Sequence, residues 1–300
     1  MERVVTNRIG SMKRAGAFTL IEMLVVLAVI GILAAILLPT LSKSKSRAQA
    51  VFCLNNTKQL TLGWVMYADD HEGRLAYNLG VTNSFGVGGI SGGPTASAMA
   101  LNWADNILNW EVVNSDNTNS AKLTAGGLGP YVSQAARIYR CPSDHVLSEL
   151  QSKAGWGGRV RSYSMNAMIG DAGSFSRWGY NLNNPDYIQF FKFSTISRPS
   201  EIFVFLDEHP DTIRDGYFVN RAYDPRWMRL PASYHDRAAA FSFADGHSEI
   251  HRWQCPSTMP PSQPFQANAP VRIPSDQRAD FNWVISKMSK SAPADADQAW

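Results

Sequence analysis

The sequence predicts an α+β fold, in which a long N-terminal spine helix packs on a mainly antiparallel β-sheet head with loop-rich insertions. Three observations support this prediction. The apolar segment 17–38 continues into an imperfect helical stripe that reaches Asp70. The short apolar run 201–207 suits a buried strand. Residues 239–253 alternate apolar and small or polar side chains around Asp245-Gly246, a pair typical of a tight hairpin turn.

The composition is that of a folded chain without a basic binding surface. Of its 300 residues, 45% are apolar and 18% are charged, which excludes a disordered, collagen-like or disulfide-dense protein. Residues 1–16 carry the whole formal net charge of +3, so the remainder is neutral. Because duplex binding needs basic groups that neutralise phosphates, we expect no nucleic-acid partner.

Residues 17–38 contain Glu22 as their only charge. As a helix they would extend about 33 Å, enough to cross the core of a bilayer. The alternatives are a buried core helix, which is rarely apolar on every face for so long, and a signal peptide, whose apolar region is shorter. We therefore expect a retained single-pass membrane helix over residues 18–39. The basic leader favours a cytoplasmic N-terminus.

Glu22 is the anomaly in this segment, because a carboxylate within a membrane helix usually marks a function or a partner. It lies near the N-terminal end, where snorkelling to the headgroups is the simplest explanation. The alternative is that the Glu22 carboxylate forms an ion pair with an α-amino group at the same membrane depth. That group would be a newly exposed N-terminus on this chain or on a neighbouring one.

Residues 13–22, Lys-Arg-Ala-Gly-Ala-Phe-Thr-Leu-Ile-Glu, precede the apolar helix. They resemble the class III leader of type IV pilins and type II secretion pseudopilins. The resemblance implies that a prepilin peptidase removes the leader and methylates the new N-terminal residue, Phe18. It also implies that Glu22 helps to dock the subunit into a filament.

The scissile bond has two candidate positions. The peptidase prefers glycine before the cut, but Gly16 is followed here by Ala17 and not by the phenylalanine. A cut after Gly16 leaves Ala17 at the N-terminus. A cut after Ala17 restores the usual spacing from Phe18 to Glu22, and we favour it.

Further motifs extend the resemblance over about residues 13–253. In the second half, His235 is followed by nine residues and then by Asp245-Gly246. The chain is similar to the large pseudopilin-like proteins of planctomycete-type bacteria that carry a prepilin-type processing-associated His-X9-Asp-Gly motif. This group implies no biochemical role for the head. The other motifs are Cys53-Leu54-Asn55-Asn56-Thr57-Lys58-Gln59-Leu60, Tyr67-Ala68-Asp69-Asp70, Cys141-Pro142-Ser143-Asp144 and Ser162-Tyr163-Ser164-Met165-Asn166.

The chain divides into five expected parts. They are a leader over 1–17, a membrane helix over 18–39, an exposed continuation of the spine over 40–70, the α+β head over 71–255 and a proline-rich tail over 256–300. Within the tail, residues 281–288 have the pattern of a short helix that docks back on the head.

The three cysteines cannot all pair within one chain. In an outward-facing compartment disulfides persist, and we expect a bond between Cys53 and Cys141 that ties the head to the spine, with Cys255 free. The alternative is three reduced, partly buried thiols.

The chemistry of the head has a structural and a functional interpretation. The sequence has no Gly-X-Ser-X-Gly, His-Glu-X-X-His or Cys-X-X-Cys motif, and we expect no enzyme. A turn fully accounts for Asp245 and Gly246. A metal-dependent hydrolase around His235 and Asp245 is the minority hypothesis. Because pseudopilin heads often bind calcium, the resemblance implies a calcium site that uses Asp207, Glu208 or Asp245.

The sequence thus predicts a membrane-anchored pilin-like structural subunit that assembles into a type II secretion pseudopilus or type IV pilus-like fibre. We expect it in the inner (cytoplasmic) membrane, with the head in the periplasm or outside the cell. Its expected partners are the prepilin peptidase, other pilin or pseudopilin subunits, the lipid bilayer and the secretion or pilus assembly machinery. The alternative is a membrane-tethered extracytoplasmic binding module that does not polymerise.

Mass spectrometry of the mature N-terminus tests the leader. We expect a chain that begins with methylated Phe18, whereas methylated Ala17 would place the cut after Gly16. A protein that keeps residues 1–17, or one trimmed beyond Leu38, would contradict the leader and the retained helix.

Overall fold

The computed structural model describes residues 19–80, 101–177, 180–266 and 269–292. It divides the chain into two compact units, residues 1–45 and residues 46–300, which are described separately below. Helix α1 (Leu20–Asp70) spans 51 residues and runs through the boundary. The α+β fold with a long helical spine is confirmed.

In the first unit, the described residues belong to the N-terminal part of α1. Its large apolar side chains are exposed throughout, from Leu20 at 84% to Leu38 at 67%. Within the described part of the chain, α1 is the one helix long and apolar enough to cross a membrane. In water such a surface would be unstable, so this part of α1 requires lipid or other apolar helices around it.

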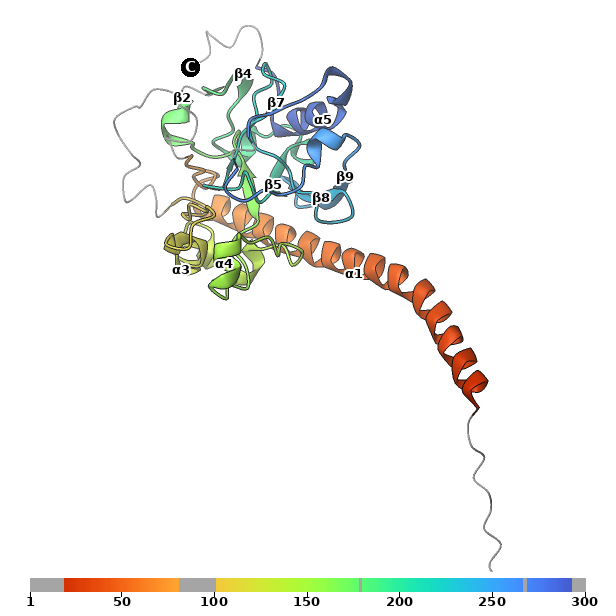
Figure 1. Ribbon diagram of the computed structural model, residues 1–300. Helices are drawn as coiled ribbons and strands as arrows, with labels where there is room; N and C mark the ends of the chain where they lie inside the picture. The colour runs from red at the N-terminus through yellow and green to blue at the C-terminus, as the bar shows by residue number, and fades with distance from the viewer. Residues whose placement is uncertain (1–18, 81–100, 178–179, 267–268, 293–300) are drawn as a thin grey trace, which may run out of the picture. The chain divides into compact units, whose positions relative to one another are not determined.

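The second unit, residues 46–300, is an α+β head built around a sheet (Figure 1). Its other α-helices are α3 (Ala121–Thr124), α4 (Glu149–Lys153) and α5 (Ala279–Met288). The strands are β1 (Tyr163–Asn166), β2 (Ser176–Arg177), β3 (Tyr180–Asn181), β4 (Asn184–Ile188), β5 (Phe203–Asp207), β6 (Tyr217–Phe218), β7 (Arg226–Trp227), β8 (Ala238–Phe243), β9 (Ser248–Arg252) and β10 (Val271–Arg272). The single-turn 3-10 helices are η2 (Ser115–Asn117), η3 (Gly129–Val132), η4 (Ala136–Tyr139), η5 (Gly173–Phe175), η6 (Phe193–Thr195), η7 (Pro199–Glu201), η8 (Pro256–Thr258) and η9 (Ser275–Gln277).

The main sheet has the strand order β6-β1-β5-β8-β9. All its pairs are antiparallel except β1 with β6. Strands β8 and β9 form the hairpin that the Asp245-Gly246 pair predicts, and Gly246 has the positive φ of +89° that glycine accepts without strain. The register of β1 and β5 places Tyr163 opposite Asp207, the last residue of β5.

Each face of this sheet is covered by a helix. On one face, the C-terminal part of α1 contributes Leu60, Trp64 and Tyr67 to a core cluster that includes Phe205 of β5. On the other face, α5 contributes Phe281, Val284 and Met288 to a second cluster with Phe203 and Phe241. Figure 1 shows β5 and β8 between these two helices. The sheet is therefore buried on both sides, as the continuous burial of β5 and β8 requires.

The C-terminal residues pack more closely than the expected proline-rich tail. Strand β10 pairs with β7, and Val271 lies opposite Trp227. The predicted short helix is present as α5, where the Asp280 carboxylate accepts hydrogen bonds from the backbone N–H groups of Gln254 and Cys255. The expectation of an extended tail was wrong for this part, because its few apolar side chains complete the second core cluster.

At Gly63, helix α1 packs closely against Val132 of η3. A Cβ atom at this position would lie 2.6 Å from Cγ1 of Val132, well inside van der Waals contact. Alanine is the better helix former by about 1 kcal/mol, but overpacking a core usually costs about 1–3 kcal/mol. The cost of the close contact with Val132 therefore exceeds the gain in helix propensity that alanine would bring.

We predict that Gly63→Ala lowers the free energy of unfolding of the head by about 1–2 kcal/mol. Thermal unfolding of the full-length chain in detergent measures this change. Gly31→Ala is the matched control, because that helical position has no atom within 4 Å of an added Cβ. A Gly63→Ala variant as stable as the wild type would show that the segment around Val132 moves to accommodate the methyl group without a loss of stability.

Candidate functional site

The first candidate site is the N-terminal end of α1, where Thr19 and Glu22 form a capping box. The Glu22 carboxylate accepts hydrogen bonds from the backbone N–H and the hydroxyl of Thr19, both at 2.7 Å. The Thr19 hydroxyl accepts one from the backbone N–H of Glu22 at 3.3 Å. The two residues thereby satisfy backbone donors that the first turn of a helix leaves unpaired. Glu22 thus has a local role in starting the helix.

The residues predicted to be processed, Gly16, Ala17 and Phe18, lie outside the described residues. The structure therefore leaves the scissile bond a prediction. It does place Glu22 in the first turn of α1, directly before the exposed apolar surface of that helix.

A second candidate site lies inside the head, where four ligand-type side chains converge. Cys53 comes from α1, Cys141 from the loop after η4, Asp207 from the end of β5 and His235 from the loop before β8. Their sulfur, oxygen and nitrogen atoms all lie within 4.8 Å of one another, and all four residues are buried. We call these four residues the Cys–Asp–His cluster.

Short contacts connect the members of the cluster. The Cys53 thiol donates to Oδ2 of Asp207 at 2.9 Å. Nε2 of His235 lies 3.3 Å from the same oxygen and 3.4 Å from the sulfur of Cys141. Asp207 Oδ2 and His235 Nε2 are therefore the two central atoms, and each of them contacts one of the two sulfurs.

Neighbouring groups hold the cluster in position. The hydroxyl of Tyr163 donates to the Cys53 sulfur at 3.2 Å, and the backbone N–H of Ala240 donates to Asp207 Oδ2 at 3.1 Å. Ser143 Oγ lies 3.5 Å from Nδ1 of His235, the ring nitrogen that faces away from the cluster. Asp207 Oδ1, by contrast, is buried and has no hydrogen-bond partner within the described part of the chain.

The cluster favours positive charge at its centre. Burial, the Cys141 hydrogen bond and the nearby Asp207 charge together raise the pKa of Cys53 well above its usual value. For His235, burial opposes the charged ring, but hydrogen bonds and charge from Asp207 and Cys141 outweigh it and raise its pKa to about 10. The Asp207 carboxylate contributes to both pKa shifts: it adds to the effect of burial at Cys53 and opposes it at His235.

Two groupings made from the sequence can be compared with the structure. Cys53 and Cys141 come together as expected, and all three cysteines are free thiols here, which is the alternative considered from the sequence. The Cys53–Cys141 disulfide stays a prediction; in the structure the two sulfurs instead contact Asp207 and His235. His235 and Asp245 do not form a shared site, because Asp245 instead pairs with His247 at 2.6 Å in the hairpin turn.

The three carboxylates proposed as calcium ligands have separate partners. Asp207 belongs to the Cys–Asp–His cluster, and Glu208 lies 3.7 Å from the guanidinium of Arg229. Asp245 is partly exposed in the turn. Calcium binding stays a prediction, and this arrangement does not favour it, because Ca²⁺ needs six to eight oxygen ligands at one place.

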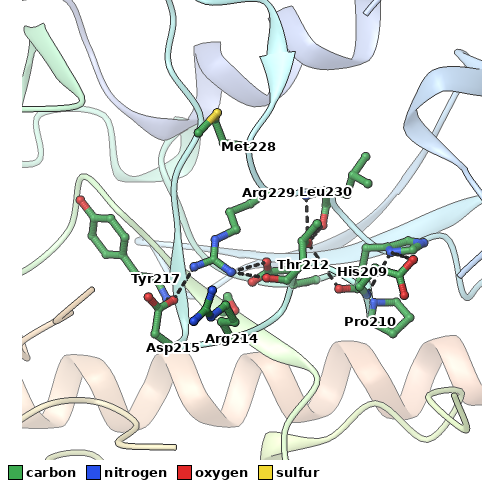
Figure 2. A network of polar contacts seen from close by, with 12 residues as sticks. His209, Pro210, Thr212, Arg214, Asp215, Tyr217, Met228, Arg229 and Leu230 are labelled. Atoms are coloured by element: carbon green, nitrogen blue, oxygen red, sulfur yellow. Dashed lines mark hydrogen bonds and ion pairs between the residues drawn. The ribbon is translucent and has the colours of Figure 1, made fainter. Parts of the chain in front are cut away.

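A buried network of charged groups lies beside the cluster, and sequence reasoning missed it (Figure 2). The Arg229 guanidinium donates to Asp215 at 2.8 Å and to the backbone carbonyl of Thr212. Arg161, which is fully buried, donates to the carbonyls of Tyr163 at 2.7 Å and Arg214 at 2.8 Å. Arginine is rarely buried, so no local pattern would have signalled these residues.

Burial dominates the electrostatics of this network. It lowers the pKa of Arg161 to about 10 and raises that of Glu208, against the opposing attraction between the two charges. Through Arg229 the network connects the loop between β5 and β6, which carries Thr212 and Asp215, to the segment after β7. Its role is therefore to hold these loops together on the main sheet.

Comparison with known proteins adds one match, at the N-terminus. Residues 12–38 match the family model described as the prokaryotic N-terminal methylation motif. The chain carries a prepilin-type N-terminal motif. This motif supports a type IV pilin-like protein that is processed by a prepilin peptidase and associates with the membrane. Neither the curated proteins nor the solved structures contain a match to the chain.

We predict that Arg229→Met lowers the free energy of unfolding of the head by about 3–5 kcal/mol, because it leaves buried carboxylates without their cation. Chemical denaturation of the full-length chain measures the change. Arg226→Met is the matched control, since Arg226 pairs with Asp224 at the surface, where solvent screens the charges. Equal effects of the two substitutions would contradict a stabilising role for the buried network.

Proposed function

We propose that the protein is a membrane-anchored pilin-like structural subunit that assembles through the apolar part of α1 into a pseudopilus or type IV pilus-like fibre. In this proposal a prepilin peptidase at the inner membrane removes the leader, and the head faces the periplasm or the cell exterior. The subunit acts by assembly and not by catalysis. The observation that carries the proposal is a carboxylate, Glu22, in the first turn of a helix whose large apolar side chains are exposed from Leu20 to Leu38.

The exposed surface of α1 supports helix–helix packing as well as membrane insertion. Leu24 and Leu27 are 59% and 67% exposed, and Ile36 is 61% exposed two to three turns later. Consecutive large side chains cover every direction around the helix axis, so no single face is reserved for the protein's own core. Such a helix can contact lipid in the single subunit, and it can contact the identical helices of other subunits after assembly.

Glu22 supplies the specificity that apolar packing lacks. A row of leucine, isoleucine and valine side chains can slide along a similar helix at little cost, whereas a carboxylate in lipid needs a partner at a defined depth. The α-amino group freed by leader cleavage is such a partner. Pairing the two favours one stagger between neighbouring subunits over the others.

Glu22 has two properties that substitutions can separate. As a hydrogen-bond acceptor it satisfies the backbone N–H of Thr19 within its own helix. As a negative charge it can attract an α-amine on a neighbour. Glutamine keeps the acceptor and removes the charge, while alanine removes both.

We predict that Glu22→Gln and Glu22→Ala both leave membrane insertion intact and both reduce self-assembly severely. Crosslinking in native membranes, read as a ladder of self-contacts through α1, measures assembly. Thr19→Ala is the control for capping: it weakens the helix start by about 1 kcal/mol but keeps the charge, and we expect nearly normal ladders.

Two results would contradict the proposal. Normal ladders for Glu22→Gln would show that capping, and not charge, is the function of Glu22. A wild-type protein that is membrane-bound but gives no ladder would instead favour a tethered binding module that does not polymerise.

A further inference from the structure

We propose that the Cys–Asp–His cluster is a structural zinc site that fixes the spine helix to the head, with Cys53, Cys141, Asp207 and His235 as its four ligands. The inference is independent of assembly, because all four residues belong to the unit 46–300.

The chemistry of the ligands selects the metal. Two thiolates and one imidazole are ligands that Zn²⁺ prefers, and a carboxylate oxygen is an accepted fourth. Thiols are poor ligands for Ca²⁺ and Mg²⁺, which take oxygen. The set of two cysteines, one histidine and one aspartate thus differs from the calcium site that the sequence suggested.

The geometry is close to what a tetrahedral ion needs. With zinc–ligand bonds of about 2.0–2.3 Å, the ligand atoms of a tetrahedron lie about 3.3–3.8 Å apart. In the structure the measured pairs are 2.9, 3.3 and 3.4 Å, and all pairs lie within 4.8 Å. These separations therefore differ from those of a zinc-bound tetrahedron by about 1 Å or less.

The carboxylate of Asp207 retains an unused ligand atom. Asp207 is 0% exposed, and among the residues that the structure describes its Oδ1 atom has no hydrogen-bond partner. Both thiols are also 0% exposed and face this carboxylate. A divalent ion at their centre would bind the carboxylate, replace the protons of the thiols and hold both cysteines as thiolates.

The surroundings fit a metal site beyond its first ligands. A ligating histidine normally has its second ring nitrogen fixed by a neighbour, and Ser143 Oγ lies 3.5 Å from Nδ1 of His235. The Tyr163 hydroxyl donates to the Cys53 sulfur, as is common around metal thiolates. Two consecutive residues with positive φ, Asp236 and Arg237, follow His235 and turn the chain sharply at this point.

The site is suited to a structural role. Its four ligands are all protein side chains and all are buried, whereas a catalytic zinc keeps one position open to water or substrate. Cys53 on α1 is joined through the ion to segments 88, 154 and 182 residues further along the chain. One ion thus connects the spine to the loop after η4, the end of β5 and the start of β8.

An entry route is present next to the site. Cys141 forms part of the wall of a cavity of about 690 Å³. The cavity is also lined by Asn56 of α1 and by Pro142 in the loop after η4. A small movement of this loop would expose the Cys141 sulfur to a hydrated ion.

The test uses the full-length protein purified in detergent with reducing agent, and adds Zn²⁺ or Co²⁺ alone. We expect one zinc per chain by elemental mass spectrometry and a higher Tm, since the ion binds the folded state. Co²⁺ substitution should give a thiolate-to-cobalt charge-transfer band and the strong visible bands of tetrahedral cobalt. Cys141→Ser and Asp207→Asn should weaken zinc binding by about 100-fold or more.

Cys255→Ser is the matched control, because Cys255 is a buried free thiol outside the cluster, and it should bind zinc as the wild type does. If a cluster variant fails to fold, the cobalt spectrum of the wild-type protein still tests the proposal, because it reports directly on thiolate ligands. Three results would overturn the proposal: no stoichiometric zinc, cobalt bands without thiolate character, or peptide mapping of protein isolated without reductant that shows a Cys53–Cys141 disulfide.

Discussion

Helix α1 meets two different surroundings along one continuous backbone. From Leu20 to Leu38 its large apolar side chains are exposed, an arrangement that is stable in lipid or among other apolar helices. Beyond Ser46 one face of the same helix, including Cys53 and Trp64, is buried in the core of the head. Because a helix satisfies its own backbone hydrogen bonds, it can serve in both surroundings without interruption. The anchor, the proposed docking carboxylate and the core of the head therefore all depend on this 51-residue helix.

The head contains two buried polar centres of different composition. Around Arg161 and Arg229, cationic groups are matched by carboxylates and backbone carbonyls, so the charge is largely balanced within the chain. In the Cys–Asp–His cluster, two thiols, one carboxylate and one imidazole converge, a set of donors that suits the proposed ion. Both centres join segments that are distant in sequence. They can therefore determine how loops are arranged on the sheet, which apolar packing alone specifies less strictly.

Local chemistry in the sequence was sufficient for the main elements of the fold. The apolar segment predicted the membrane part of α1, and Asp245-Gly246 predicted the β8–β9 hairpin, since both signals act within a few residues. The pairing of β10 with β7 was not predictable in this way, because a two-residue strand has almost no pattern of its own. Every member of the Cys–Asp–His cluster was a candidate from sequence, but in three unconnected hypotheses. Their grouping depends on the β1–β5 register and on where α1 crosses the sheet, which are tertiary features.

Hydrogen–deuterium exchange of the full-length protein in lipid nanodiscs tests most directly whether one helix is both anchor and core. We predict slow exchange over residues 20–38, where lipid covers the helix, and again over residues 53–68, where the head covers it. Faster exchange should separate the two regions near residues 43–47, where side chains of α1 are mostly exposed. Exchange over residues 20–38 that is equally fast with and without lipid would contradict a membrane anchor. Loss of protection over residues 53–68 would contradict the role of α1 in the core of the head.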